Sequence, residues 1–142
     1  MNSRDFRVAY LETVYVTETL RFTLSSTDFG ITVFEGRRFC LLTAANPFSQ
    51  ELTLAENGER NLELERQIKA LGLGYSWSYG EQSDSSWRED GFVIFDVSLE
   101  TAMLLARTFD QNAILYGQDA RVALAWCDNE ELEWFFVRLE ID

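Results

Sequence analysis

The segment "GFVIFDVSLETAMLLARTFDQNAILYG", residues 91–117, contains a helix-forming stretch between two apolar stretches. Residues 91–97 and 112–117 are rich in Val, Ile, Phe and Tyr, a composition that favours buried strands. Ser98 is suited to cap a helix over residues 99–109. One face of that helix carries four apolar side chains: Leu99, Ala102, Met103 and Ala106. A strand, a helix and a strand in this order predict a right-handed parallel crossover.

The flanking sequence adds strands on both sides of this unit. Alternating or apolar stretches predict strands at residues 13–26, 29–34, 38–45, 121–127 and 132–141, the last two forming a hairpin around "DNEE". Residues 75–90, "YSWSYGEQSDSSWRED", are rich in Gly and Ser, which is typical of a loop with short strands. We therefore predict a single globular domain, residues 1–142, of the α/β or α+β class. Its mixed sheet has about six to seven strands and is accompanied by two main helices and the C-terminal hairpin.

The composition excludes several kinds of catalytic site. The chain has no histidine, which removes Ser-His-Asp and Cys-His catalysis and any zinc site that uses imidazole. Its two cysteines, Cys40 and Cys127, lie in apolar stretches and predict buried reduced thiols, with a disulfide as the alternative. No cofactor, metal site or catalytic residue is assigned from the sequence.

The charge of the chain limits its partners. The net charge is −12 and Lys69 is the single lysine, so direct binding to nucleic acid or to an anionic membrane is not expected. The sequence begins without an apolar signal segment and has no stretch long enough to cross a bilayer, which predicts a cytoplasmic protein. The acidity either keeps the protein soluble or suits a basic protein partner.

A helix predicted from Thr53 to about Leu71, ending at Gly72, has an unusual inner stripe. Six residues share this stripe: Leu54, Asn57, Asn61, Leu64, Ile68 and Leu71. The two asparagines either hold irregular backbone, such as "NPFSQ" or "SSWRED", or line a pocket together with Arg60. We hypothesise that Asn61 is structural and that Asn57 faces a pocket.

Four segments carry a family resemblance: "LLTAANPFSQ", "ENGERNLELERQIKALG", "WREDGFVI" and "LARTFDQNAILYG". Over residues 39–117 this pattern resembles the bacterial family known as domain of unknown function 3293. The chain departs from the family pattern at Asp110, where a small residue is common, and at Gly91, where serine is common. The resemblance implies no activity. It draws attention to eight polar or aromatic positions: Thr43, Asn46, Asn57, Arg60, Trp87, Glu89, Gln111 and Asn112.

These eight positions fall at the ends of predicted elements, and we expect them to converge at one edge of the sheet as a ligand-binding site. Arg60 is suited to hold an anion, and Glu89 is the best candidate acid or base. Trp87 either stacks on a ligand ring or fills the core. The purely structural alternative is an Arg60–Glu89 ion pair that fixes the loop to the helix.

The sequence alone assigns no reaction. The leading interpretation is a small acidic protein that binds a small polar or anionic ligand or a basic protein. One alternative is an enzyme that acts on a polar or phosphorylated small molecule through Glu89 or Glu56, and another is an acidic mimic of nucleic acid. A water-accessible pocket that contains Glu89 with a raised pKa would favour the enzyme. Carboxylates spaced along one face, without a pocket, would favour the mimic.

Overall fold

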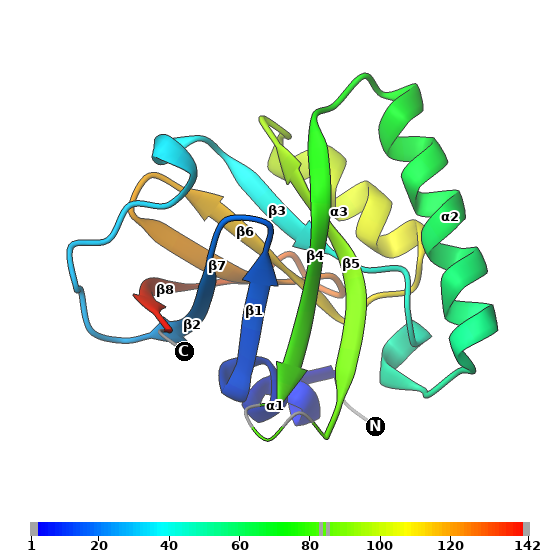
Figure 1. Ribbon diagram of the computed structural model, residues 1–142, viewed down its shortest axis with the longest axis horizontal. Helices are drawn as coiled ribbons and strands as arrows, with labels where there is room; N and C mark the ends of the chain where they lie inside the picture. The colour runs from blue at the N-terminus through cyan, green and yellow to red at the C-terminus, as the bar shows by residue number, and fades with distance from the viewer. Residues whose placement is uncertain (1–2, 83, 85, 141–142) are drawn as a thin grey trace.

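The computed structural model describes residues 3–82, 84 and 86–140, and in these residues eight strands form a closed barrel (Figure 1). Every neighbouring pair is antiparallel, in the order β1-β2-β8-β7-β6-β3-β5-β4. The strands are β1 (Thr13–Thr17), β2 (Arg21–Ser25), β3 (Phe39–Leu42), β4 (Tyr75–Gln82), β5 (Arg88–Phe95), β6 (Ala113–Gln118), β7 (Arg121–Trp126) and β8 (Leu132–Leu139). We call the end of the barrel at which β1 and β5 begin the lower end, as it is drawn in Figure 1.

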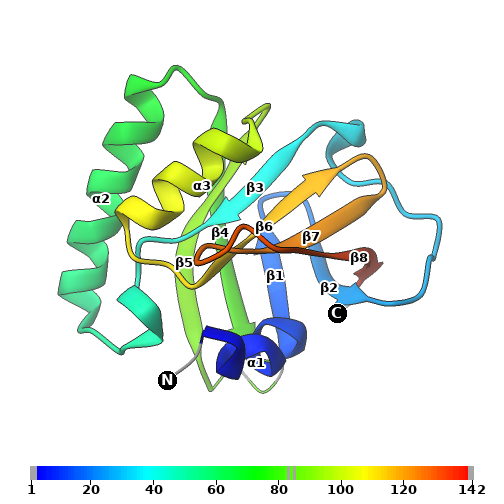
Figure 2. The same ribbon diagram turned by 180° about the vertical axis from the view of Figure 1, so that it is seen from behind.

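Helices cover part of the barrel wall and its lower end. The α-helices are α1 (Arg7–Glu12), α2 (Leu54–Ala70) and α3 (Leu99–Thr108), and the 3-10 turns are η1 (Ser3–Phe6), η2 (Phe34–Gly36) and η3 (Pro47–Ser49). Seen from behind, α3 lies across the outer wall at β3 and β6, with α2 beside β5 (Figure 2). The short α1 lies below β1. None of the helices in the described residues has the length and apolarity that a bilayer span requires.

The predicted α/β or α+β mixed sheet of about six to seven strands with two main helices is wrong, because the described residues form a closed barrel of eight strands in which every neighbouring pair is antiparallel, with three α-helices outside it. Since β3 pairs antiparallel with both β5 and β6, those two strands, which were expected to form a parallel crossover, run in the same direction but are not neighbours. Residues 75–82, predicted as part of a loop with possible short strands, form one strand of eight residues that pairs with both β5 and β1 and closes the barrel. Residues 29–34 form no strand, and two residues of residues 75–90 lie outside the described part of the chain.

Strand alternation produces two cores, one inside the barrel and one between its wall and the helices. The inner core includes Phe22, Phe39, Trp126 and Val137. The outer core includes Leu64, Ile68, Ile94 and Met103. Strand β3 contributes to both, which explains why its apolar residues face both ways. Both cysteines are buried and free, which confirms the thiol prediction.

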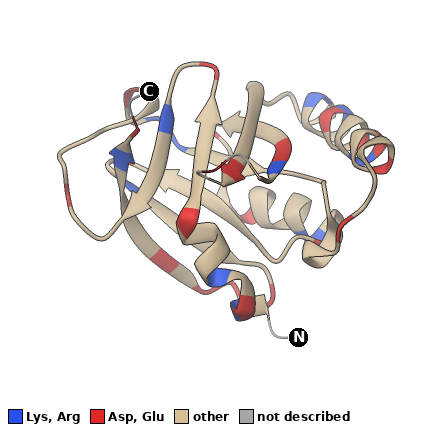
Figure 3. Ribbon diagram, turned by 60° about the horizontal axis from the view of Figure 1, so that its bottom comes forward, with Lys and Arg blue, Asp and Glu red and all other residues tan. Residues whose placement is uncertain are grey.

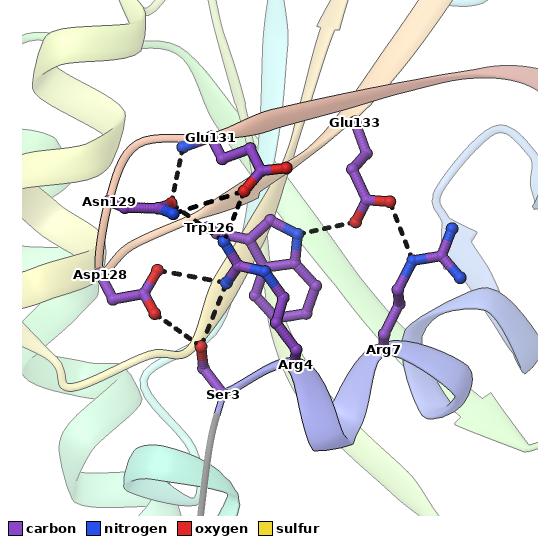
Figure 4. Close-up of polar contacts among 8 residues, drawn as sticks. All are labelled: Ser3, Arg4, Arg7, Trp126, Asp128, Asn129, Glu131 and Glu133. Atoms are coloured by element: carbon purple, nitrogen blue, oxygen red, sulfur yellow. Dashed lines mark hydrogen bonds and ion pairs between the residues drawn. The ribbon is translucent and has the colours of Figure 1, made fainter.

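The N-terminal segment is fixed against the turn between β7 and β8 (Figure 4). Arg4 forms ion pairs with Asp128 (3.2 Å) and Glu131 (3.0 Å), and its guanidinium lies 4.1 Å from the centre of the Trp126 ring. Arg7 pairs with Glu133 at 2.9 Å, and the same carboxylate accepts a hydrogen bond from the Trp126 indole. These contacts hold α1 against the lower end, where its Tyr10 and Leu11 pack on the inner core.

Candidate ligand-binding site

The two asparagines of α2 hold the backbone that follows β3. Asn61 accepts a hydrogen bond from the Ala44 amide (2.9 Å) and donates to the Asp90 carbonyl (3.0 Å). Asn57 accepts from the Asn46 amide (2.9 Å) and donates to the Asn46 side-chain oxygen (2.8 Å). Both residues therefore satisfy irregular backbone, as the structural interpretation expected. The ends of the predicted stripe do not belong to the core, because Leu54 is 91% exposed and Leu71 52% exposed.

Arg60 holds the same backbone from the other side. Its Nε donates to the Ala44 carbonyl (2.5 Å) and its Nη2 donates to the Phe109 carbonyl (2.6 Å). The guanidinium therefore ties the end of β3 to the end of α3. The Arg60–Glu89 ion pair is absent from the interactions of the described residues, so the purely structural alternative is wrong in that detail.

Gln111 and Asn112 complete the support for this segment. The Gln111 amide group donates to the carbonyls of Ala45 (3.0 Å) and Phe109 (3.1 Å), and the side chain is buried. Asn112 donates to the Ser49 hydroxyl at 2.9 Å. The exit of β3 is thus bound to α2, to β5 and to the segment between α3 and β6.

Asn46 lies at the centre of this hydrogen-bond network, and its side chain orients the carboxyl group of Glu89. Its backbone adopts a left-handed conformation (φ 48°), which asparagine tolerates better than most residues. Its side-chain oxygen accepts from the amide of Leu52 (2.9 Å) and from Asn57, and its Nδ2 donates to Oε2 of Glu89 (2.9 Å). Because all of these groups are engaged, the position of the Asn46 amide is fixed, and so is its hydrogen bond to the carboxyl group.

Strand β5 directs Glu89 into the barrel. Glu89 pairs with Gly80 of β4 and precedes Gly91 by two residues, so it points to the same face. A Cβ at Gly91 would lie 2.5 Å from the Leu42 carbonyl oxygen, so the glycine lets the end of β3 approach β5 closely. A serine at this position would not fit this local geometry without a backbone shift.

Two spaces meet at Glu89. The inner cavity, of about 70 Å³, lies within the lower end of the barrel and includes Tyr10, Thr13, Tyr15, Thr43, Ser78, Trp87, Glu89 and Gln111 among its lining residues. The outer groove, of about 650 Å³, includes Phe6, Tyr10, Thr13, Asn46, Glu51, Asn57, Trp87, Arg88 and Glu89. Four residues line both spaces and form what we call the neck: Tyr10, Thr13, Trp87 and Glu89.

Burial raises the pKa of Glu89 to about 7, although the hydrogen bond from Asn46 acts in the opposite direction. No lysine or arginine in the described residues forms an ion pair with this carboxyl group. Burial also raises the pKa values of Tyr10 and Tyr15, and the nearby Glu89 adds to both shifts. The neck therefore contains a carboxyl group that changes its charge near neutral pH, while the nearby Tyr10 and Tyr15 stay protonated.

The eight positions predicted from the sequence all belong to the lower end, but they contact different spaces. Thr43, Trp87, Glu89 and Gln111 line the inner cavity. Asn46 and Asn57 join Trp87 and Glu89 in the outer groove, so Asn57 is both a backbone anchor and a groove residue. Asn112 lines a separate pocket of about 220 Å³, and Arg60 does not appear in the lining of either space that meets at the neck. Trp87 is 39% exposed, so it does not fill the core.

Sequence reasoning missed the contribution of the N-terminal segment and of β4. Thr13 and Tyr15 alternate in "TVYVT" and therefore share the inner face of β1. Ser78 and Gly80 share the inner face of β4 in the same way, a signal that is visible once residues 75–82 are read as a strand. No sequence signal placed Tyr10, because its position depends on the docking of α1. Among the described residues, no cluster of three or more potential metal ligands is present.

The model of one protein family matches residues 42–114, just over half of the chain. The chain belongs to the family described as "Protein of unknown function (DUF3293)". The matched residues include α2, β4, β5 and α3 and all eight predicted positions, whereas Tyr10, Thr13 and Tyr15 lie outside the match. No curated protein and no solved structure matches the chain. The match to the family model therefore includes Asn46 and Glu89, but of the neck residues it includes only Trp87 and Glu89.

Proposed function

We propose that this protein binds a small molecule at the lower end of the barrel, where the molecule enters the outer groove and reaches Glu89 in the neck. The observation that carries the proposal is a mostly buried carboxyl group that has no positive partner in the described residues and lies where a groove meets a cavity. Burying an ionisable group without a partner of opposite charge lowers stability, and shifted ionisable groups are concentrated at functional sites.

The polar network supports this interpretation because its hydrogen bonds lead to one point. Asn57 and Leu52 fix Asn46, and Asn46 fixes the Glu89 carboxyl group. Arg60 and Gln111 hold the same segment through its carbonyls. A carboxyl group whose orientation is set by such a supporting layer is ready to contact a bound molecule without reorganisation.

Acid–base catalysis on the bound molecule is the second candidate function. Glu89 lines a pocket and has a pKa of about 7, which is the criterion that favours an enzyme, because proton transfer at neutral pH is most efficient with such a group. Glu56 does not share this role. Its carboxylate forms a capping box with Thr53 at the start of α2, and these hydrogen bonds lower its pKa.

No observation favours the nucleic-acid mimic. In the view of the lower end in Figure 3, acidic and basic positions are interspersed along α2 and around α1 and do not form a continuous acidic band. The cytoplasm is our proposal for the compartment, because two buried free thiols suit a reducing environment.

A thermal-shift screen of small molecules tests the proposed function. The variants are Glu89→Gln, which keeps a hydrogen-bond acceptor for Asn46, and Glu59→Gln, a matched control on the exposed face of α2. We expect hits that stabilise the wild type and the control but stabilise Glu89→Gln less. The proposed site would be contradicted if no compound of a diverse library raises the melting temperature, or if the compounds that do so stabilise Glu89→Gln as much as the wild type. Recovery of a hit as a changed molecule, detected by mass spectrometry, would select the enzyme over the binding protein.

A further inference from the structure

We infer that the ligand of this site is a small organic cation, with its ammonium group against Glu89 and its apolar part along Trp87 in the outer groove. The inference rests on the proposed function and names the class of molecule that the site accepts. It depends on the charges, the lining and the size of the two spaces.

The positive side chains around the lower end are engaged elsewhere. Arg7 pairs with Glu133 at 2.9 Å. Arg88, although it lies beside Glu89 in sequence, points to the outside of β5, where it pairs with Asp90 (2.9 Å) and lies 3.7 Å from the centre of the Tyr79 ring.

Two further arginines complete this pattern. Arg60 donates to two backbone carbonyls, and Arg4 pairs with Asp128 and Glu131. The ionised form of Glu89 therefore lacks a counter-charge from the described residues. A ligand cation would supply that charge in a place where little water screens it.

The lining of the neck and the inner cavity suits an ammonium group. Asn46 uses Oε2 of Glu89, and no hydrogen bond of the described residues uses Oε1. Ser78 is buried and lines the cavity, and its hydroxyl has no hydrogen-bond partner among the described residues. An ammonium group has three donors that could meet such acceptors. Tyr10 and Trp87 line the neck, and the faces of aromatic rings attract cations.

The two spaces differ in size, so we assign the ammonium group of the ligand to the inner cavity and the rest of the molecule to the outer groove. The inner cavity, at about 70 Å³, has room for a group of a few heavy atoms, whereas the outer groove, at about 650 Å³, has room for a larger part of the molecule. Glu51 and Arg88 both line the groove, with Arg88 paired to Asp90, and the net charge of −12 attracts cations to the protein as a whole.

The alternatives fit this lining less well. An anion would meet the Glu89 carboxylate directly, and the Arg60 guanidinium is already bonded to Ala44 and Phe109. A divalent metal needs several oxygen ligands, and no cluster of three potential metal-binding side chains occurs in the described residues. A neutral molecule with a hydrogen-bond acceptor would need the protonated form of Glu89, so its affinity would change with pH in the opposite direction.

Isothermal titration calorimetry with matched probes tests the inference. The probes are primary ammonium ions from methylammonium to benzylammonium, with benzyl alcohol as the neutral match and benzoate as the anionic match. At pH 8 we expect at least one ammonium ion to bind the wild type and Glu59→Gln with a Kd at least tenfold lower than that of the alcohol. We expect the same ion to bind Glu89→Gln at least tenfold more weakly.

The pH dependence of the wild type provides a second measurement, independent of any variant. An ammonium ion competes with the proton on Glu89, so its Kd should rise about tenfold between pH 8 and pH 6. The other ionisable groups near Glu89 in the neck and the inner cavity are Tyr10 and Tyr15, whose pKa values are raised far above this range. In the outer groove the other ionisable side chains are Glu51 and Arg88.

Two results would overturn the inference, and they separate it from the proposed function. Preference for benzyl alcohol or benzoate, weakened in Glu89→Gln, would keep the small-molecule site but exclude the cation. Ammonium binding that is equal in wild type and Glu89→Gln and independent of pH would exclude a cation at Glu89, and the site then depends on the thermal-shift screen. If the thermal-shift screen also finds no compound that depends on Glu89, both the cation and the site fail.

Discussion

Replacing Glu89 by glutamine should remove a pH-dependent loss of stability from the protein. Glutamine has nearly the same shape and keeps an oxygen for the hydrogen bond from Asn46, but it cannot ionise. Because burial disfavours the charged carboxylate, the wild type must either hold a proton on Glu89 or bury a charge there as the pH rises.

The magnitude follows from the difference between the two pKa values. The folded protein binds the Glu89 proton with a pKa of about 7, whereas the ordinary value is 4.5, so the folded state holds more protons between these values. Stability from this group is fully present below pH 4.5 and is lost as the pH rises to about 7. At 1.36 kcal/mol per pKa unit the loss is about 3 kcal/mol. For a chain of this size that corresponds to a melting temperature change on the order of 10 °C.

Urea unfolding, followed by tryptophan fluorescence from pH 4.5 to pH 8, measures this loss. The free energy of unfolding of wild type minus that of Glu89→Gln should fall by about 3 kcal/mol over this range. Carboxylates with lowered pKa values, such as Asp96 and Asp128, are common to both proteins and cancel in the difference. A difference that stays constant with pH would refute the reasoning, because Glu89 would then have the same pKa in both states.

Three further outcomes follow from the structure. Asn57→Leu and Asn61→Leu should each lower the free energy of unfolding by about 1–3 kcal/mol, because each leaves backbone groups without a partner; a neutral or stabilising effect in urea unfolding would contradict the backbone role. Burial raises the pKa of Cys40 to about 12 and that of Cys127 to about 11, so a thiol reagent should detect neither in the native protein and both after denaturation without reductant. Duplex DNA should show no mobility shift at physiological salt, and micromolar, salt-sensitive binding would contradict the argument from charge.

Local signals were sufficient to predict α2. Thr53 caps the helix, Glu56 completes the capping box, and Gly72 follows its end with a positive φ of 72°. The predicted bounds agree with Leu54–Ala70 to within a residue or two. These signals act between residues a few positions apart, so they remain readable in a single sequence.

Barrel closure could not be read in the same way, because it depends on pairing between distant strands. In β4, the inner face carries the small residues Ser76, Ser78 and Gly80, while Trp77 is 49% exposed on the outer face. Small polar residues inside and an aromatic outside reverse the usual pattern of a half-buried strand, so the segment resembled a loop. The insertion of β3 between β5 and β6 likewise leaves no local trace.

The candidate site was predictable for residues that lie at the ends of elements visible in the sequence. It was not predictable for residues that reach the site through the packing of α1 against the barrel. Asn46 follows a predicted strand and Glu89 lies at the end of a predicted loop, just before the next strand, which is why their convergence was expected. Tyr10 reaches the neck only because Arg4 and Arg7 bind acidic residues more than a hundred positions away in the sequence. Such long-range ion pairs cannot be assigned among the 24 acidic residues of the chain.

The ionisation of Glu89 is the most direct test of the central claim, which is that the neck contains a buried carboxyl group without a positive partner. Carbon-13 NMR of the glutamate side-chain carboxyl carbons, assigned with the Glu89→Gln variant, measures it in the free protein. The structure predicts a titration midpoint at about pH 7. A midpoint at or below the ordinary value of 4.5 would show that the carboxylate is solvated or paired, and would contradict both the candidate site and the ligand class inferred for it.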